Sequence, residues 1–211
     1  MIDKDLRKLV GKYLVDGYGS SGDKEAQKYY REAAKHIKLA SKYYTKSFLG
    51  KFVRCDYEMY SEYADKGYKE EKLIDEPLLK AIEHGHDLAV LHYAILLYCK
   101  NVDIMFWQRI VNKTYERDEV CSAMDETLKW LQRADELGFA PAAYMLSVFY
   151  RSKNKFRESD EEKSEYYYSR YRSLCDSSER QRILSMFIPS WADKDGARDP
   201  LSFKTWFGPA I

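Results

Sequence analysis

The chain has 211 residues, of which 45% are hydrophobic and 33% are charged, and its formal net charge is +1. A chain of this length buries a core without covalent staples, and its ordinary composition with five prolines excludes a largely disordered protein.

The four cysteines, at positions 55, 99, 121 and 175, are scattered without a close pair. This spacing favours neither a zinc cluster nor a small disulfide framework, so a reducing compartment is the simpler interpretation. The first 18 residues mix charged and apolar positions, unlike a secretory signal. The longest nearly apolar run, Leu88–Tyr98, is far shorter than the roughly 20 residues that a membrane span requires. We therefore expect a soluble, cytoplasmic protein with no membrane partner.

Charge is unevenly distributed along the chain. Residues 1–54 carry a net charge of +7, residues 55–92 carry −6, and the remainder is balanced. Such an asymmetry can orient a charged partner.

A long amphipathic helix dominates the first quarter of the sequence. We expect a short helix at about residues 3–14, then a glycine-rich loop, and then a helix from Asp23 to about Phe48. Asp23 suits the cap because its side-chain oxygen can accept from the first free amides. The apolar residues recur at spacings of three and four, which places them on one stripe. They are Tyr30, Ala33, Ile37, Ala40 and Tyr44.

Two shorter helices follow, and glycine is expected to end both of them. They are predicted over residues 52–66 and 75–84, directly before Gly67 and Gly85. Glycine adopts the left-handed conformation that ends helices at little cost. A helix over residues 87–99 is then expected to pack back against the second of them. Its inward residues are predicted to be Leu88, Leu91, Ile95 and Leu96.

The middle of the chain contains two further helices and an apolar-periodic segment at residues 102–115. A helix is predicted from Ser122, as its cap, to residue 137, with Gly138 closing it. Pro141 suits the first turn of the next helix, which should end near residue 151, because its missing amide donor costs nothing there.

The last part of the chain is predicted to hold two helices and an irregular aromatic tail. The helices are expected over residues 161–174 and 178–187, and the tail over residues 189–211. No convincing run of alternating apolar and polar residues occurs in the sequence. The fold should therefore be all helical.

One spaced pattern of small and large residues occurs twice. The first copy is Ala81, Gly85, Ala89, Tyr93 and Ala94, and the second is Ala134, Gly138, Ala142, Leu146 and Tyr150. Alanines on both sides of a chain-reversing glycine let two helices approach closely, while leucine and tyrosine supply volume against a neighbouring unit. The pattern therefore indicates stacked helix pairs.

This pattern resembles the Sel-one-like repeat, a relative of the tetratricopeptide repeat built from antiparallel helix pairs. The second copy matches well, and Ser147 stands where the family usually has glycine. The first copy departs from the pattern, with Leu97 in place of the late tyrosine and Tyr98 one position on. The two glycines are 53 residues apart, so about 15 residues within 101–119 look inserted relative to one family unit. Helices around residues 26–34 and 163–171 look like degenerate flanking units.

The resemblance implies a right-handed α-α superhelix, a solenoid of antiparallel helix pairs. It would form a single helical-repeat domain over residues 1–188, with clear units at about 74–98 and 122–151 and the aromatic tail of residues 189–211 docked on it. It also implies a protein-binding scaffold. Family members act as adaptors, and bacterial ones are often encoded as immunity or accessory proteins beside secreted toxins, so a toxin or effector is the partner that the resemblance suggests.

No catalytic, cofactor or metal site is predicted. Glu83, His84, His86 and His92 include zinc-ligand types, but His84 and His86 straddle a glycine turn and cannot share a helical face. The glycine-rich stretch 17–22 lacks the strand and the lysine-serine pair of a phosphate-binding loop. No motif joins a cysteine to a histidine. We therefore expect a non-enzymatic protein without a cofactor.

Aromatic residues suggest one candidate interaction surface. The 19 tyrosines, four tryptophans and nine phenylalanines exceed what a helical core of this size requires, and such side chains dominate interface energetics. The inserted segment concentrates several of them with an arginine. The candidate partner-binding residues are Phe106, Trp107, Arg109 and Tyr115. The plain alternative is that Phe106 and Ile110 are core residues of an additional helix. Of Tyr166, Tyr167 and Tyr168, at least one should be exposed.

Cations on the long helix suggest a second surface. They recur at helical spacing on the side opposite the apolar stripe. These residues, called the basic face, are Lys24, Lys28, Arg31, Lys35, Lys38 and Lys42. Three interpretations remain open: a solvated face, a surface for an acidic protein, or a phosphate-tracking surface of a nucleic-acid-associated protein.

Overall fold

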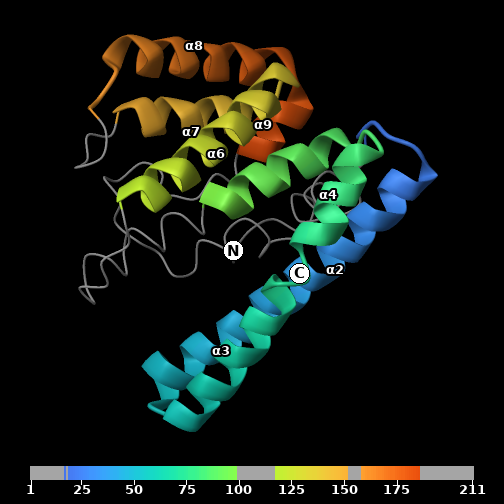
Figure 1. The fold of residues 1–211 in the computed structure, drawn as a ribbon, viewed down its shortest axis with the longest axis vertical. Coiled ribbons are helices and arrows are strands. Elements are labelled where there is room, and N and C mark those ends of the chain that lie inside the picture. The colour runs from blue at the N-terminus through green and yellow to red at the C-terminus, as the bar shows by residue number, and fades with distance from the viewer. Residues whose placement is uncertain (1–16, 18, 99–116, 152–157, 186–211) are drawn as a thin grey trace. The chain divides into compact units, whose positions relative to one another are not determined.

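The fold is described by a computed structural model that covers residues 17, 19–98, 117–151 and 158–185 (Figure 1). Every regular element within these ranges is a helix, and none of their residues belongs to a strand, as the sequence predicts. The chain divides into two compact units between Ala89 and Val90. The predicted helix at residues 3–14, the 102–115 segment and the aromatic tail lie outside the described residues. The single-domain organisation stays a prediction.

The first unit is built on α2 (Lys24–Leu49), which confirms the predicted long helix. It begins where the sequence places its cap, because the Asp23 carboxylate accepts a 2.8 Å hydrogen bond from the Ala26 amide. Four members of the predicted apolar stripe are buried, and the fifth, Tyr44, is half-buried. Periodicity and a local cap therefore suffice to define this helix.

A short π-helical turn, η2 (Gly50–Arg54), leads from α2 into α3 (Tyr57–Glu71), and the two long helices lie antiparallel, side by side (Figure 1). The predicted helix over residues 52–66 is shifted, because Asp56 caps α3 by accepting from the Met59 amide at 2.9 Å. The predicted end at Gly67 is wrong. A Cβ at this buried position would lie 2.7 Å from the Tyr44 ring of α2, so the glycine here permits close helix packing instead of ending the helix.

The third helix of this unit is α4 (Asp75–Glu83), which packs against α2. Gly85 follows it with a φ of 84°, the left-handed conformation that the sequence predicts there. Residues 87–98 then form the next helix. The four residues predicted to point inward are all buried: Leu88, Leu91, Ile95 and Leu96.

The second unit contains the better copy of the repeat, in α6 (Arg117–Glu136) and α7 (Ala140–Arg151). Gly138, with a φ of 81°, separates them as predicted. The predicted start at Ser122 is wrong, because α6 begins at Arg117 and Ser122 lies inside it. The five residues before Ser122 include no glycine or proline, so a capping residue alone does not stop the helix there. Pro141 lies in the first turn of α7, as predicted.

Two more helices, α8 (Glu161–Ser177) and α9 (Glu179–Ser185), pack against α7. The Ser164 hydroxyl of α8 donates to the Ser147 carbonyl of α7 at 2.9 Å. Gln181 of α9 accepts from the buried Ala140 amide at 3.0 Å, which satisfies a free donor at the start of α7. Helix α7 is thus surrounded by α6, α8 and α9, and its residues from 140 to 150 are buried except for two.

No helix within the described ranges combines the length and the apolar character needed to cross a bilayer.

Candidate binding surfaces

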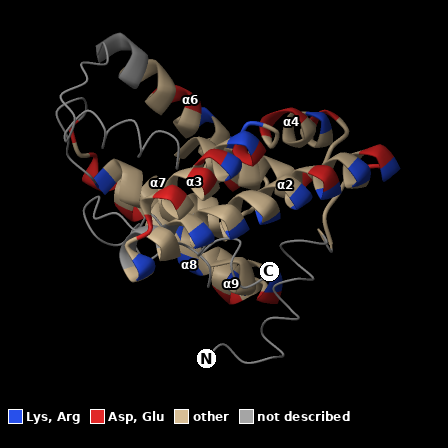
Figure 2. Cartoon of the chain, turned by 90° about the horizontal axis from the view of Figure 1, so that it is seen from below, with Lys and Arg blue, Asp and Glu red and all other residues tan. Residues whose placement is uncertain are grey.

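The basic face lies along α2 and is exposed at all six positions. At 3.6 residues per turn these side chains occupy a stripe about 80° wide and roughly 27 Å long. The stripe lies opposite the apolar residues that pack on α3 and α4, and Figure 2 shows Lys and Arg recurring along α2. The structure therefore brings together the cations that the sequence singled out.

Little inside the described part of the chain neutralises this face. Lys28 pairs with Glu25 at 3.1 Å, and this hydrogen bond raises the pKa of the Lys28 ammonium. The other five cations form no ion pair with a described residue. The face thus presents a row of solvated positive charges.

The carboxylates of the neighbouring helices are engaged elsewhere. On α3, Glu62 pairs with Lys66, and Glu70 lies 2.7 Å from Nδ1 of His36. Glu71 accepts from the Tyr44 hydroxyl, and on α4 Glu76 pairs with Lys80 at 2.7 Å. Glu70 and Glu71 therefore tie α3 to α2, while Glu62 and Glu76 pair with lysines of their own helices, and none of these four carboxylates pairs with the basic face.

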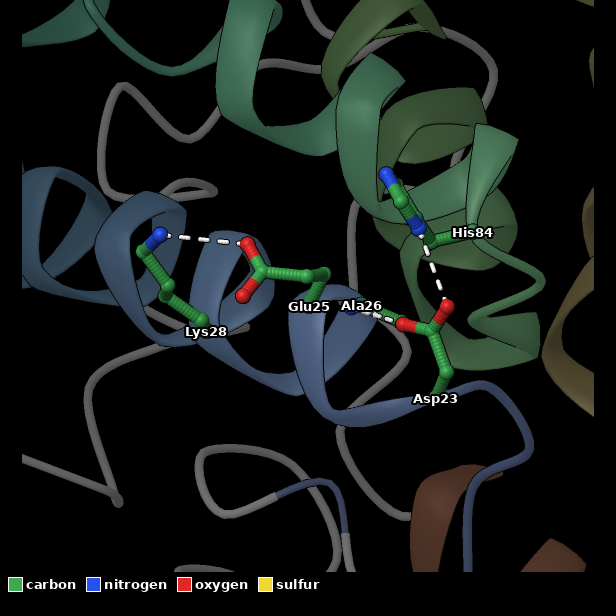
Figure 3. A network of polar contacts seen from close by, with 5 residues as sticks. All are labelled: Asp23, Glu25, Ala26, Lys28 and His84. Atoms are coloured by element: carbon green, nitrogen blue, oxygen red, sulfur yellow. Dashed lines mark hydrogen bonds and ion pairs between the residues drawn. The ribbon is translucent and has the colours of Figure 1, made fainter.

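A polar clasp fixes the start of α2 to the turn after α4 (Figure 3). Asp23 caps α2 through one carboxylate oxygen, and Nδ1 of His84 lies 3.0 Å from the other. The amide of Ala26 and then His84 hold the pKa of the Asp23 carboxyl below its usual value of 3.8. The Ser21 hydroxyl donates to the Gly85 carbonyl at 2.7 Å, and its amide donates to Asp87 at 3.2 Å. This clasp sets the position from which the basic face extends.

The glutamate and histidines that the sequence analysis considered as zinc ligands have different environments in the structure. Glu83 is exposed, His84 joins the clasp, and His86 is buried against the Tyr30 ring with centroids 4.1 Å apart. Nδ1 of His86 accepts from the Ala89 amide at 3.3 Å, so His86 caps the 87–98 helix. Among the described residues, no three His, Cys, Asp or Glu side chains gather in a way that could hold a metal ion.

The aromatic surface predicted from the inserted segment cannot be placed. Phe106, Trp107, Arg109 and Tyr115 all lie outside the described residues. On α8 the tyrosine expectation is confirmed, because Tyr166 and Tyr168 are 60% and 47% exposed. Tyr167 between them stacks on the Tyr150 ring of α7, 5.6 Å centroid to centroid.

Sequence reasoning missed an ion pair that joins α6 to α8. Nε of Arg170 donates to the Asp135 carboxylate at 2.6 Å, and its Nη2 donates to the Asp135 carbonyl at 2.9 Å. Burial raises the pKa of the Asp135 carboxyl, and Arg170 opposes that rise only in part. The two residues are 35 positions apart and follow no motif, so the sequence carries no signal for the pair.

It also missed the exposed apolar end of the α2–α3 hairpin. Leu49, Val53 and Tyr57 are 40%, 65% and 70% exposed where α2 passes through η2 into α3. Elsewhere, an open hollow of about 640 Å³ is lined by polar residues of α8 alone. These residues are Ser169, Arg172, Ser173, Asp176 and Ser177. A hollow on one exposed helix face assembles no reactive pair.

Scans of this chain against protein-family models, curated proteins and solved structures find no match.

Proposed function

We propose that the chain is a Sel-one-like helical-repeat scaffold that binds another protein and carries out no chemistry. The observation that carries this proposal is the α6–α7 pair. Ala134 and Ala142, on either side of the left-handed Gly138, are completely buried, as a close contact between paired helices requires. Leu146 and Tyr150 of α7 are also buried.

The first copy of the pattern, in α4 and the 87–98 helix, supports the same interpretation. Ala81, Ala89 and Ala94 are fully buried around the left-handed Gly85. Two sequence stretches with the same spacing thus produce the same local arrangement: helix, glycine turn, helix. We propose that these units and their neighbours continue into a right-handed superhelix in which each unit packs on the next.

The exposed side chains support binding more than catalysis. The basic face, the tyrosines of α8 and the apolar end of the α2–α3 hairpin present charge and aromatic area to solvent. Tyrosine and arginine side chains are among the groups that carry most of the binding energy of protein interfaces. The resemblance to Sel-one-like repeats suggests a cytoplasmic immunity or adaptor protein whose partner is a secreted toxin or effector.

Affinity purification from the source cells, followed by mass spectrometry and reconstitution with the purified candidate, tests this proposal. We expect one protein to form a complex of fixed stoichiometry with the full-length chain. The affinity of the double variant Trp107→Ala/Arg109→Ala for the reconstituted partner, compared with wild type, tests whether the inserted segment contributes to partner binding. Recovery of nucleic acid alone, with no protein that reconstitutes, would contradict the scaffold proposal.

A further inference from the structure

The cations of the basic face follow a seven-residue repeat. Their spacings alternate four and three along the whole row, so positions of the same kind recur every seven residues. Such a row drifts by only about 20° per seven residues around a straight helix, and it therefore stays on one side for five turns. A second helix laid along it would meet the cations at matching intervals.

An apolar residue continues this repeat at the end of the row. Leu49 comes seven residues after Lys42 and is 40% exposed, and Val53, one turn later, is 65% exposed. The surface thus offers positive charge over most of its length and an aliphatic contact at the C-terminal end of α2. We propose, resting on the protein-binding function above, that this face binds an acidic amphipathic helix of a partner protein, with carboxylates at four-three spacing and an apolar residue at one end.

Charge complementarity determines the choice of occupant. Five of the six cations form no ion pair with the described residues, and four carboxylates of α3 and α4 contact other groups. Opposite charges across paired helices select the partner and its register. The basic face lacks its counter-charges, and a helix with acidic residues in the same repeat supplies them.

The shape and the flanks of the face disfavour nucleic acid. A helix in the DNA major groove, about 12 Å wide, meets phosphates on both of its flanks and reads bases between them. Here all six cations share one narrow stripe. Glu25, which pairs with Lys28, and the exposed Glu32 lie beside the stripe and lower the positive potential on that flank.

The test uses a cross-linked helical peptide of about 20 residues, long enough for the row at 1.5 Å per residue. It carries glutamates at four-three spacing, leucine at both ends, and alanine and glutamine elsewhere. A control peptide has the same composition with the glutamates distributed around the helix. Fluorescence anisotropy with the full-length chain measures both at low and at physiological salt. We expect the patterned peptide to bind at least 10-fold more tightly than the control, and its binding to weaken with added salt.

The matched protein variants change equal charge on two helices of the same unit. The basic-face variant is Arg31→Gln/Lys35→Gln/Lys38→Gln. The control is Lys66→Gln/Lys69→Gln/Lys72→Gln, on α3 and its C-terminal cap. Glutamine forms helices nearly as well as lysine or arginine, so both variants should fold, which circular dichroism checks. We expect the first variant to lose at least 10-fold in peptide affinity and the second to lose less than threefold.

Each other outcome overturns the inference. Equal binding of both peptides, or equal loss in both variants, would mean a general charge effect. No peptide binding would mean a solvated face. The probes for nucleic acid are a 20-base-pair DNA duplex and an RNA of equal length. If either binds more tightly than the peptide, and the basic-face variant loses that binding, the face is a nucleic-acid surface. If a reconstituted partner binds the basic-face variant as tightly as wild type, this inference fails while the proposed scaffold function stands.

Discussion

Asp23 performs two tasks at the start of α2. It caps the helix through the Ala26 amide and contacts His84 across the turn after α4. These contacts lower the pKa of its carboxyl below 3.8, so its charged form stabilises the folded chain at higher pH. That contribution is fully present above pH 3.8 and is lost as the pH falls through the lower, folded-state pKa.

The first prediction follows from the lowered pKa of the Asp23 carboxyl. Asp23→Asn keeps an acceptor for the Ala26 amide but loses the charge, whereas Asp23→Ala loses both. At neutral pH we expect stability to fall in the order wild type, Asn variant, Ala variant. The gap between wild type and the Asn variant should close as the pH falls below 3.8 and through the lower, folded-state pKa of Asp23. Urea unfolding across this pH range measures it, and a gap that does not change with pH would contradict the assigned role of the charge.

The Asp135–Arg170 pair supports a second prediction at this scale. Burial raises the pKa of Asp135, and Arg170→Met would remove the cation that opposes the rise. Breaking a fully buried pair costs about 3–5 kcal/mol, but Arg170 is 34% exposed, so we expect roughly 1–3 kcal/mol at neutral pH.

A carboxyl with a raised folded-state pKa costs stability as the pH rises through that pKa. The deficit of Arg170→Met should therefore be larger at pH 7 than at pH 4, as measured by urea unfolding. Arg172→Met, at an exposed position on the same helix, should change stability by less than about 0.5 kcal/mol. Equal deficits at both pH values would show that only packing is lost.

At the scale of elements, the contact between α2 and α3 depends on a residue with no side chain. Gly67→Ala would gain about 1 kcal/mol of helix propensity, but its Cβ would lie 2.7 Å from the Tyr44 ring. Because overpacking costs roughly 1–3 kcal/mol, we expect a net loss. The loss should disappear in a Tyr44→Leu background, where the ring is absent. A stabilised Gly67→Ala single variant would contradict this account of the glycine.

The α6–α7 contact makes the matching prediction for the repeat. Ala142→Leu should destabilise the chain by roughly 1–3 kcal/mol, because the residue is completely buried between packed helices. Ala123→Leu, at a partly exposed position of α6, is the control and should cost less than about 0.5 kcal/mol. Thermal and urea unfolding compare the two, and equal costs would remove the argument for close pairing at Ala142.

The elements that sequence predicted best are those defined by their own residues. Helix α2 has a local cap and a strict apolar period, and both are visible without the fold. The end of α3 was predicted wrongly because tertiary packing decides it, and the start of α6 was predicted wrongly because a capping residue alone does not stop a helix. Gly67 serves a ring 23 positions away, and nothing in the sequence marks that contact. The basic face was predictable from spacing, whereas its lack of counter-charges depends on which partners the acidic residues of α3 and α4 take.

At the scale of the whole molecule, two helical units carry exposed charge and aromatic area, and no group of side chains among the described residues could hold a metal ion. The proposed account is that the chain holds another protein, in part along the basic face. This claim concerns the protein composition of the native assembly. The mass of that assembly is therefore the most direct quantity to measure.

Light scattering on the nuclease-treated native assembly from source cells measures that mass. The proposed account predicts a particle heavier than the 24.9 kDa chain by the mass of a different protein, in a fixed ratio. A measured mass equal to that of the chain alone, or to a whole multiple of it, at physiological salt would contradict the account.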